Sequence, residues 1–239
     1  MIALVRYLFR LFIILGIIIV ICFGALDFYF THINHIDKKV EAAAKVLYKK
    51  KNVHPLSYGQ IPLTFREAII ATEDRRFESD PGIDPIGIVR SVVVDIEHDG
   101  YIEGGSTITQ QVIDNTVLTR KKTLQQKLIQ ATLAIGLYDT MSKEEVFILY
   151  ANVIYFGNNG YGLYQAARTY FHRNPSDLNE GELTLLAGLP NSPSYFDPFL
   201  RMENARVRQK IVLENMVDAG TLTASEADKI YHEPIRLVK

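Results

Sequence analysis

The chain has 239 residues, enough for one medium-sized domain and a short additional segment. It carries 26 basic and 27 acidic side chains, a formal net charge of −1, so the composition does not indicate a nucleic-acid partner. Cys22 is the single cysteine, which excludes an intrachain disulfide.

The N-terminus contains a long apolar run. Sixteen uncharged, mostly apolar residues separate Arg10 from Asp27, and a helix of that length rises roughly 24 Å. Flanking aromatic side chains and a snorkelling Arg10 can extend this to the ~30 Å of a hydrocarbon core. A cleaved signal peptide is the alternative, but residues 23–27 make a poor cleavage site. With Arg6 and Arg10 before the run, we predict a cytoplasmic N-terminus (1–10), a single-pass transmembrane anchor (11–30) and a domain outside.

The remaining chain is expected to be mainly α-helical. A polar amphipathic helix is predicted from His35 to Lys51, within a stalk and linker (31–54) that leads to a domain at 55–239. Alternation with a period of two residues is nearly absent, which argues against strands. Several Ser or Thr residues are followed three residues later by Glu or Gln, the capping-box pattern of a helix start. These pairs are Thr64 with Glu67, Thr107 with Gln110, Ser142 with Glu145 and Thr223 with Glu226, and Gly100 and Gly220 stand at expected helix ends.

Two acidic residues, Glu73 and Asp74, stand where a helix is expected to break before Pro81-Gly82. A cleft enzyme could keep a general base at such a break. A solvated helix terminus is the better explanation of the pair when it is considered alone.

A polar segment follows at 104–111, where two glycines and two hydroxyls precede a predicted helix. Such a helix start can bind an anion such as a phosphate, although a well-made helix cap would have the same residues. A basic cluster at Arg120, Lys121, Lys122 and Lys127 could hold a pyrophosphate or form a solvated face. Lys143 and Tyr150 share one helical face that ends at Asn152, and core packing and capping also explain Tyr150 and Asn152.

Taken in order, these segments resemble the peptidoglycan glycosyltransferases of glycosyltransferase family 51, which include monofunctional enzymes and the N-terminal domains of class A penicillin-binding proteins. The resemblance runs from about residue 55 to about residue 220, and the short remainder suggests the membrane-anchored monofunctional type. The second of the four motifs matches in full. The motifs are Glu73-Asp74-x-x-Phe77 with Gly82, Gly105-Ser106-Thr107-Ile108-Thr109-Gln110-Gln111, Lys143-x-x-Val146 with Tyr150-x-Asn152, and Arg208-x-x-x-Val212-Leu213.

The resemblance implies a lysozyme-like helical domain with a small jaw lobe on the bacterial cell membrane. It implies lipid II and the growing glycan strand as substrates, with Glu73 as the general base for the acceptor 4-hydroxyl and position 130 as the second catalytic position. The donor would leave as polyprenyl pyrophosphate, with inversion. A divalent cation (Mg or Mn) and partners such as penicillin-binding transpeptidases and other cell-wall synthesis proteins are also implied. The substrate-binding residues implied are Asp74, Phe77, Gly105, Ser106, Thr107, Gln110, Gln111, Asn115, Gln126, Lys127, Lys143, Tyr150, Asn152 and Arg208.

The sequence departs from the family pattern mainly in the third motif, Arg-Lys-x-x-Glu. The matching positions read Gln126-Lys127-Leu128-Ile129-Gln130, so an arginine and the second glutamate are both glutamine. Gln130 keeps the shape of glutamate but cannot ionise. Asp80, Asp114 and Gln209 replace a histidine, a lysine and an arginine. The lost cations at 114, 126 and 209 predict a weaker positive field around a pyrophosphate, which Arg120, Lys121 or Lys122 could restore.

Three functions fit these observations. The leading hypothesis is a membrane-anchored glycan polymerase. The alternative is a catalytically degenerate relative that binds lipid II or nascent glycan as a scaffold or regulator of active synthases. A lysozyme-like enzyme that cleaves glycan is the third, with Glu73 as its general acid. The second motif and the anchor argue against it, because cleavage of finished glycan needs neither.

Overall fold

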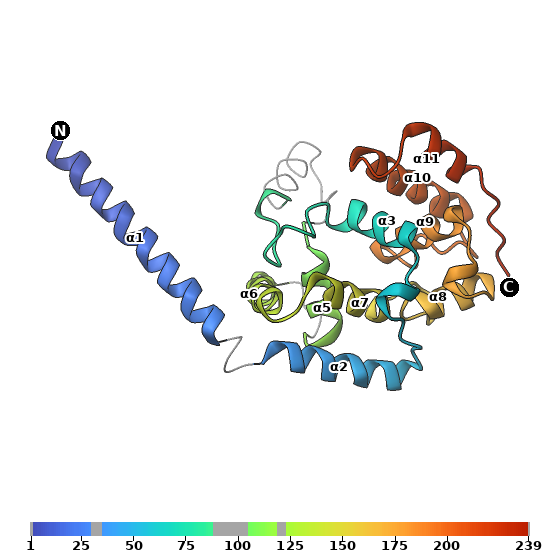
Figure 1. Cartoon of the computed structure of the whole chain (residues 1–239), viewed down its shortest axis with the longest axis horizontal. Helices are drawn as coiled ribbons and strands as arrows, with labels where there is room; N and C mark the ends of the chain where they lie inside the picture. Colours follow the sequence, from blue (N-terminus) through green and yellow to red (C-terminus); the bar gives the residue numbers. More distant parts are fainter. Residues whose placement is uncertain (1, 30–34, 88–104, 119–122, 239) are drawn as a thin grey trace.

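The computed structural model describes residues 2–29, 35–87, 105–118 and 123–238, and within these residues its regular structure is helical (Figure 1). An isolated β-bridge joins Tyr155 to Tyr161. The predicted mainly α class is therefore confirmed. The α-helices are α1 (Ile2–Phe28), α2 (Ile36–Lys51), α3 (Leu63–Glu73), α5 (Ile108–Thr116), α6 (Leu124–Thr140), α7 (Lys143–Val153), α8 (Leu163–Phe171), α9 (Glu180–Gly188), α10 (Met202–Asp218) and α11 (Ala224–Tyr231), with short 3-10 helices η2 (Tyr58–Gln60), η3 (Pro175–Asp177) and η4 (Leu189–Asn191).

Local capping chemistry fixes most helix starts where the sequence predicted them. Thr107, Ser142 and Thr223 each form a complete capping box at the first turns of α5, α7 and α11. The prediction at Thr64 was wrong, because α3 begins at Leu63 and the Thr64 hydroxyl donates to Glu180 at 3.0 Å instead. Gly220 follows α10 with a φ of +77°, as expected for a glycine helix end. Gly100 lies outside the described residues.

The helices pack in two groups that share one hydrophobic core. Helices α3, α9 and α10 pack on one another, and α2, α5, α6 and α7 form the second group. Bulky side chains such as Phe65, Tyr150 and Phe156 are fully buried between them. Glu73 is the last residue of α3, so the polypeptide leaves the first group at that residue and continues toward α5 of the second.

Helix α2 belongs to the folded body. Its residues Ile36, Val40 and Ala44 recur at four-residue spacing, lie on one face and are buried against the second group of helices. The predicted helix is confirmed, but the prediction of a free stalk is corrected, because a stalk would leave this apolar stripe in solvent.

The N-terminal end of α1 projects away from the other helices in Figure 1. Among the described residues, no helix combines the length and the apolarity needed to cross a membrane. The transmembrane anchor at 11–30 stays a prediction from the sequence.

Candidate active site

Glu73 is held where the two helix groups meet. The Gln111 side chain on α5 donates from Nε2 to Glu73 Oε2 at 2.8 Å. Arg208 on α10 places Nη2 3.6 Å from Glu73 Oε1. Only 13% of the Glu73 side chain is exposed, so its carboxylate is fixed in orientation yet still reaches the surface. Three residues predicted from separate motifs are thus brought together.

One side of the Glu73 carboxylate faces buried residues. Tyr150 is fully buried, and its hydroxyl has no hydrogen-bond partner among the described residues. Burial raises the pKa of Tyr150 well above its ordinary value, and the negative charge of Glu73 raises it further. Burial also lowers the pKa of Arg208, an effect that Glu73 opposes. Glu73 and Arg208 therefore attract each other in a partly desolvated setting, where charge interactions are stronger than in water.

A polar cleft of about 420 Å³ opens beside Glu73. Its walls come from the end of α3, the segment that follows it, the start of α5, η4 and α10. The predicted residues Glu73, Asp74, Gly105, Ser106, Thr107 and Arg208 all line it. Such a concave site with converging charged groups is the usual form of a ligand site.

One wall of this cleft was not predicted from the sequence beyond Arg208. Arg208, Ile211, Asn215 and Asp218 recur at spacings of three and four and present one face of α10 to it. Helical spacing counted forward from Arg208 could have revealed that wall. Asn191 of η4 also lines the cleft and carries no such signal. Arg75, Arg76 and Asp84 were missed too: Arg75 lies 3.7 Å from Asp218, and Arg76 Nε donates to Asp84 at 2.9 Å.

The start of α5 is tied to the first motif by hydrogen bonds. Asp74 is buried, and its Oδ2 accepts from the Ile108 backbone N–H at 3.0 Å. The Thr107 hydroxyl donates to the Gly82 carbonyl at 2.7 Å, and Gln110 closes the cap by accepting from Thr107 N–H. Two donors at this helix start are thus satisfied within the protein, by Asp74 and by Thr107, which caps Gln110 N–H. The predicted phosphate contact at 105–107 would use the remaining groups around the cleft.

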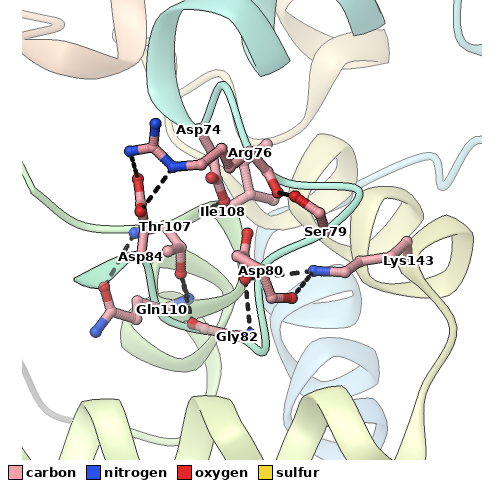
Figure 2. A network of polar contacts seen from close by, with 10 residues as sticks. All are labelled: Asp74, Arg76, Ser79, Asp80, Gly82, Asp84, Thr107, Ile108, Gln110 and Lys143. Carbon is pink, nitrogen blue, oxygen red and sulfur yellow. Dashed lines mark hydrogen bonds and ion pairs between the residues drawn. The ribbon is translucent and has the colours of Figure 1, made fainter. Parts of the chain in front are cut away.

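Asp80 and Lys143 fasten the other end of the same segment (Figure 2). Lys143 Nζ donates to the Asp80 carbonyl at 2.7 Å and lies 3.3 Å from its Oδ1. The same ammonium group lies 4.7 Å from the centroid of the Phe77 ring, an arrangement in which the ring face attracts the cation. Gly82 has a φ of +86°, and a side chain there would collide with the backbone of α6 at Ala134. Lys143 and Phe77, both predicted as substrate-binding, are committed to internal contacts here.

The third-motif residues form a second polar cluster between α5 and α6. Gln130 is buried and donates to the carboxylate of Asp114 and, at 3.3 Å, to the Gln110 carbonyl. Lys127 Nζ donates to Ser106 Oγ at 2.6 Å. Burial lowers the pKa of Lys127, and the charge of Asp114 opposes that shift. Gln130 and Asp114, the two positions where the family resemblance implies a glutamate and a lysine, are thus direct neighbours.

Other predicted residues make hydrogen bonds within the helical body. Asn152 is fully buried, donates to the carbonyls of Leu56 and Ile148 and accepts from Leu56 N–H, so it ties a loop to α7. Asn115 donates to the Gln111 carbonyl one turn earlier, and Gln126 lies in the first turn of α6. Gln209 faces α9, where it donates to the Gly181 carbonyl and the Thr184 hydroxyl. Gln209 is therefore not among the residues that line the cleft. Arg120, Lys121 and Lys122 lie outside the described residues.

The described residues do not fit a resident metal ion. They contain no group of three or more His, Cys, Asp or Glu side chains placed to hold one. Two carboxylates of the cleft are paired with arginines instead: Glu73 with Arg208, and Asp84 with Arg76. Carboxylates that are shared with guanidinium groups are poor members of the all-oxygen sets that Mg²⁺ and Mn²⁺ prefer.

The fold and the site define a helical protein with one oriented carboxylate at the edge of a polar cleft. Comparison with known families identifies the class: the transglycosylase family model matches residues 39–217. The chain belongs to this family, as a transglycosylase domain of the class A penicillin-binding protein type.

Curated relatives agree with this assignment. The chain is 39% identical over 184 residues to penicillin-binding protein 1A of Aquifex aeolicus, covering 77% of this chain and 25% of that protein. It is 38% identical over 188 residues to penicillin-binding protein 1A of Escherichia coli, covering 79% and 22%. A crystal structure of penicillin-binding protein 1A from Haemophilus influenzae aligns with a TM-score of 0.46 at 20% identity, over 78% of this chain and 18% of that one. The chain thus spans about a quarter of the length of these curated relatives.

Proposed function

We propose that this protein polymerises peptidoglycan glycan strands from lipid II. In the proposed reaction a lipid-linked glycan chain is transferred to the 4-hydroxyl of an acceptor lipid II. The observation that carries the proposal is the Glu73 carboxylate, which faces a polar cleft and is oriented by Gln111 and Arg208. Membership of the transglycosylase family supports the reaction class.

The proposed chemistry is a single displacement with general-base assistance. The acceptor oxygen attacks the anomeric carbon of the donor while Glu73 takes the hydroxyl proton. The bond from that carbon to the pyrophosphate oxygen breaks, and its electron pair leaves with the polyprenyl pyrophosphate. Attack from the face opposite to the leaving group inverts the configuration and gives a β-1,4 linkage. The hydrogen bond from Gln111 fixes Glu73 Oε2, so that Oε1 can receive the proton.

The leaving pyrophosphate needs compensation for the charge that develops on it. Arg75, Arg76 and Arg208 line the cleft, and Lys127 is held beside it through Ser106. Guanidinium groups suit this task because their donors match phosphate oxygens in pairs. The start of α5 adds the partial positive charge of a helix N-terminus.

Polymerisation of labelled lipid II by the purified full-length protein tests the proposal. Glu73→Gln is the matched variant, because the amide keeps the volume and can still bond Gln111 while it cannot accept the proton. An active relative in the same preparation serves as the positive control. Polymer from the native protein that is lost in Glu73→Gln is the expected result. Polymer that persists in the variant would contradict the role of Glu73.

A second candidate function is a scaffold that binds lipid II or nascent glycan without polymerising it. Gln130 favours it, because this buried amide stands where the family has an ionisable acid. Binding of labelled lipid II without polymer, while the active relative succeeds, is the result expected for a scaffold.

Three further features stay predictions from the sequence and its family resemblance. They are attachment to the bacterial cell membrane through residues 11–30, assistance by Mg²⁺ or Mn²⁺, and cooperation with penicillin-binding transpeptidases. Polymerisation measured with and without a chelator tests the cation.

A further inference from the structure

Two carboxyl groups next to the candidate general base lie buried together. Asp74 and Asp80 are each 4% exposed. One oxygen of each side chain is occupied: Asp74 Oδ2 accepts from Ile108 N–H, and Asp80 Oδ1 accepts from Gly82 N–H at 2.6 Å and from Lys143. The other two oxygens, Asp74 Oδ1 and Asp80 Oδ2, are buried and receive no hydrogen bond from the described residues.

The charges around the pair cannot balance two carboxylates. Lys143 of α7 is the cation in contact with Asp80, and it also lies 5.0 Å from the Tyr138 ring of α6. Arg76 of the same segment also interacts with the charges of Asp74 and Asp80, but its guanidinium is hydrogen-bonded to Asp84, which balances its charge. From α5 the pair receives the backbone N–H of Ile108, while Glu73 of α3 turns its carboxylate to Gln111 and Arg208. One lysine therefore faces two buried acids.

Each of these neighbouring acids interacts with the other and keeps one oxygen without another partner, so a single proton held between the two oxygens would satisfy both. Burial and the neighbouring charge of Asp80 raise the pKa of Asp74 to about 8, and burial also raises the pKa of Asp80. Lys143 and Gly82 N–H favour the charged form of Asp80, which leaves the proton on Asp74.

We propose that Asp74 and Asp80 share one proton at neutral pH, and that this proton fastens the segment after α3 to the start of α5, where it positions Glu73 at the cleft. Asp74 and Asp80 are positioning residues in this arrangement. They hold three groups in place relative to one another: Glu73, Gln111 and the α5 cap.

The shared proton also sets the charge of the cleft. With Asp74 neutral, three carboxylates balance three arginines along the walls, and an ionised Asp74 would add a fourth negative charge. That extra charge would repel an anionic ligand, so this consequence rests on the proposed pyrophosphate-bearing substrate. The lining groups counted are Glu73, Asp84, Asp218, Arg75, Arg76 and Arg208.

The sign of the pH dependence follows from the raised pKa. Asp74 holds its proton to about pH 8 in the folded chain but loses it near pH 3.8 when unfolded, so folding takes up a proton between these values. The contribution of the pair to the free energy of unfolding is full below about pH 4 and falls as the pH rises through 8.

Asp74→Asn is the informative variant, because its amide copies the protonated acid. Its oxygen can accept from Ile108 N–H and its nitrogen can donate to Asp80, at every pH. The melting temperature of full-length Asp74→Asn is expected to match the native protein near pH 4 and to exceed it by a gap that widens toward pH 8. A gap independent of pH, or a variant less stable than the native protein at pH 8, would overturn the proposal.

Two further measurements keep the test decisive. Asp84→Asn, which removes a carboxylate paired with Arg76 in the same segment, is the control and is expected to show no such widening gain. Infrared spectra of the native protein at pH 7 are expected to contain a protonated-carboxyl band that is absent from both Asp74→Asn and Asp80→Asn. A native spectrum without that band would contradict the shared proton even if Asp74→Asn failed to fold.

These readouts need no lipid II. Failure of the polymerisation assay would therefore leave the acid pair standing, and a missing carboxyl band would leave the polymerase proposal standing.

Discussion

Helix α5 takes part in two polar clusters, one with Glu73 and one with α6, and the two clusters differ in their charge. At the Glu73 end, an acid is matched with Arg208 and with the Gln111 amide, three residues that the resemblance assigns to one site. At the α6 end, Gln130 stands in place of an acid and donates to Asp114, which stands in place of a lysine. The negative charge at this end therefore lies on α5, at Asp114, across one hydrogen bond from the neutral Gln130 of α6.

This difference shows that a residue of the family pattern can be absent while the contact between its two helices is kept. The cluster between α5 and α6 still joins the two helices and still places a carboxylate near Lys127. Compared with the pattern that the family resemblance implies, in which residue 114 is a lysine, its positive charge is lower. The Glu73 end therefore keeps its proposed chemistry, whereas the α6 end keeps its packing and changes its electrostatics.

The largest expected effect breaks the Glu73 end. Glu73→Gln removes the proton acceptor and is expected to lower polymerisation of lipid II by about 10²- to 10⁴-fold. The melting temperature is expected to fall modestly, because the amide keeps the contact with Gln111 but no longer balances the partly buried charge of Arg208. Gln130→Ala in parallel sharpens the comparison: a loss as large as that of Glu73→Gln would show that both ends take part in the chemistry.

Arg208→Ala tests the cation of the same end. It leaves Glu73 partly buried without its charge partner and removes a donor from the cleft, so polymerisation should fall about 10²-fold. Arg208→Lys keeps the charge and should recover part of the loss. Lys210→Ala, an exposed cation on the same helix that does not line the cleft, is the control. Equal losses in Arg208→Ala and Lys210→Ala would contradict a local role.

The α6 end can be tested by a double-mutant cycle at positions 114 and 130. Gln130→Glu places two carboxylates together, and Asp114→Lys places a second cation near Lys127. Each change alone should lower the free energy of unfolding by about 1–2 kcal/mol, and the pair together should recover at least about 1 kcal/mol. Denaturant unfolding of all four proteins measures the coupling. Additive losses would show that the two positions do not interact.

The smallest expected effect concerns the cleft wall on α10. Asn215→Ala removes one polar side chain from the lining and should weaken lipid II binding about fivefold, the equivalent of one hydrogen bond of about 1 kcal/mol. Glu214→Ala changes the neighbouring, exposed residue outside the cleft and should leave binding unchanged.

The sequence predicts what is local and misses what depends on distant packing. The helix starts at Thr107, Ser142 and Thr223 were predictable because each cap is satisfied within four residues. The meeting of Glu73 with Gln111 and Arg208 was implied only by family motifs, since these residues are far apart in the chain. That Gln209 faces α9 and Asp80 faces Lys143 depends on which side of a helix or loop is buried, which residue type alone does not reveal.

Helix α2 has a practical consequence for anyone who wishes to shorten this protein. A fragment cut at residue 55, the boundary suggested by the sequence motifs, would lack Ile36, Val40 and Ala44 and would strip the covering from an apolar face of the second helix group. Such a fragment is expected to aggregate. Inhibitors found with it would include compounds that bind only to the exposed apolar face. A fragment prepared for inhibitor screening should therefore begin before Ile36.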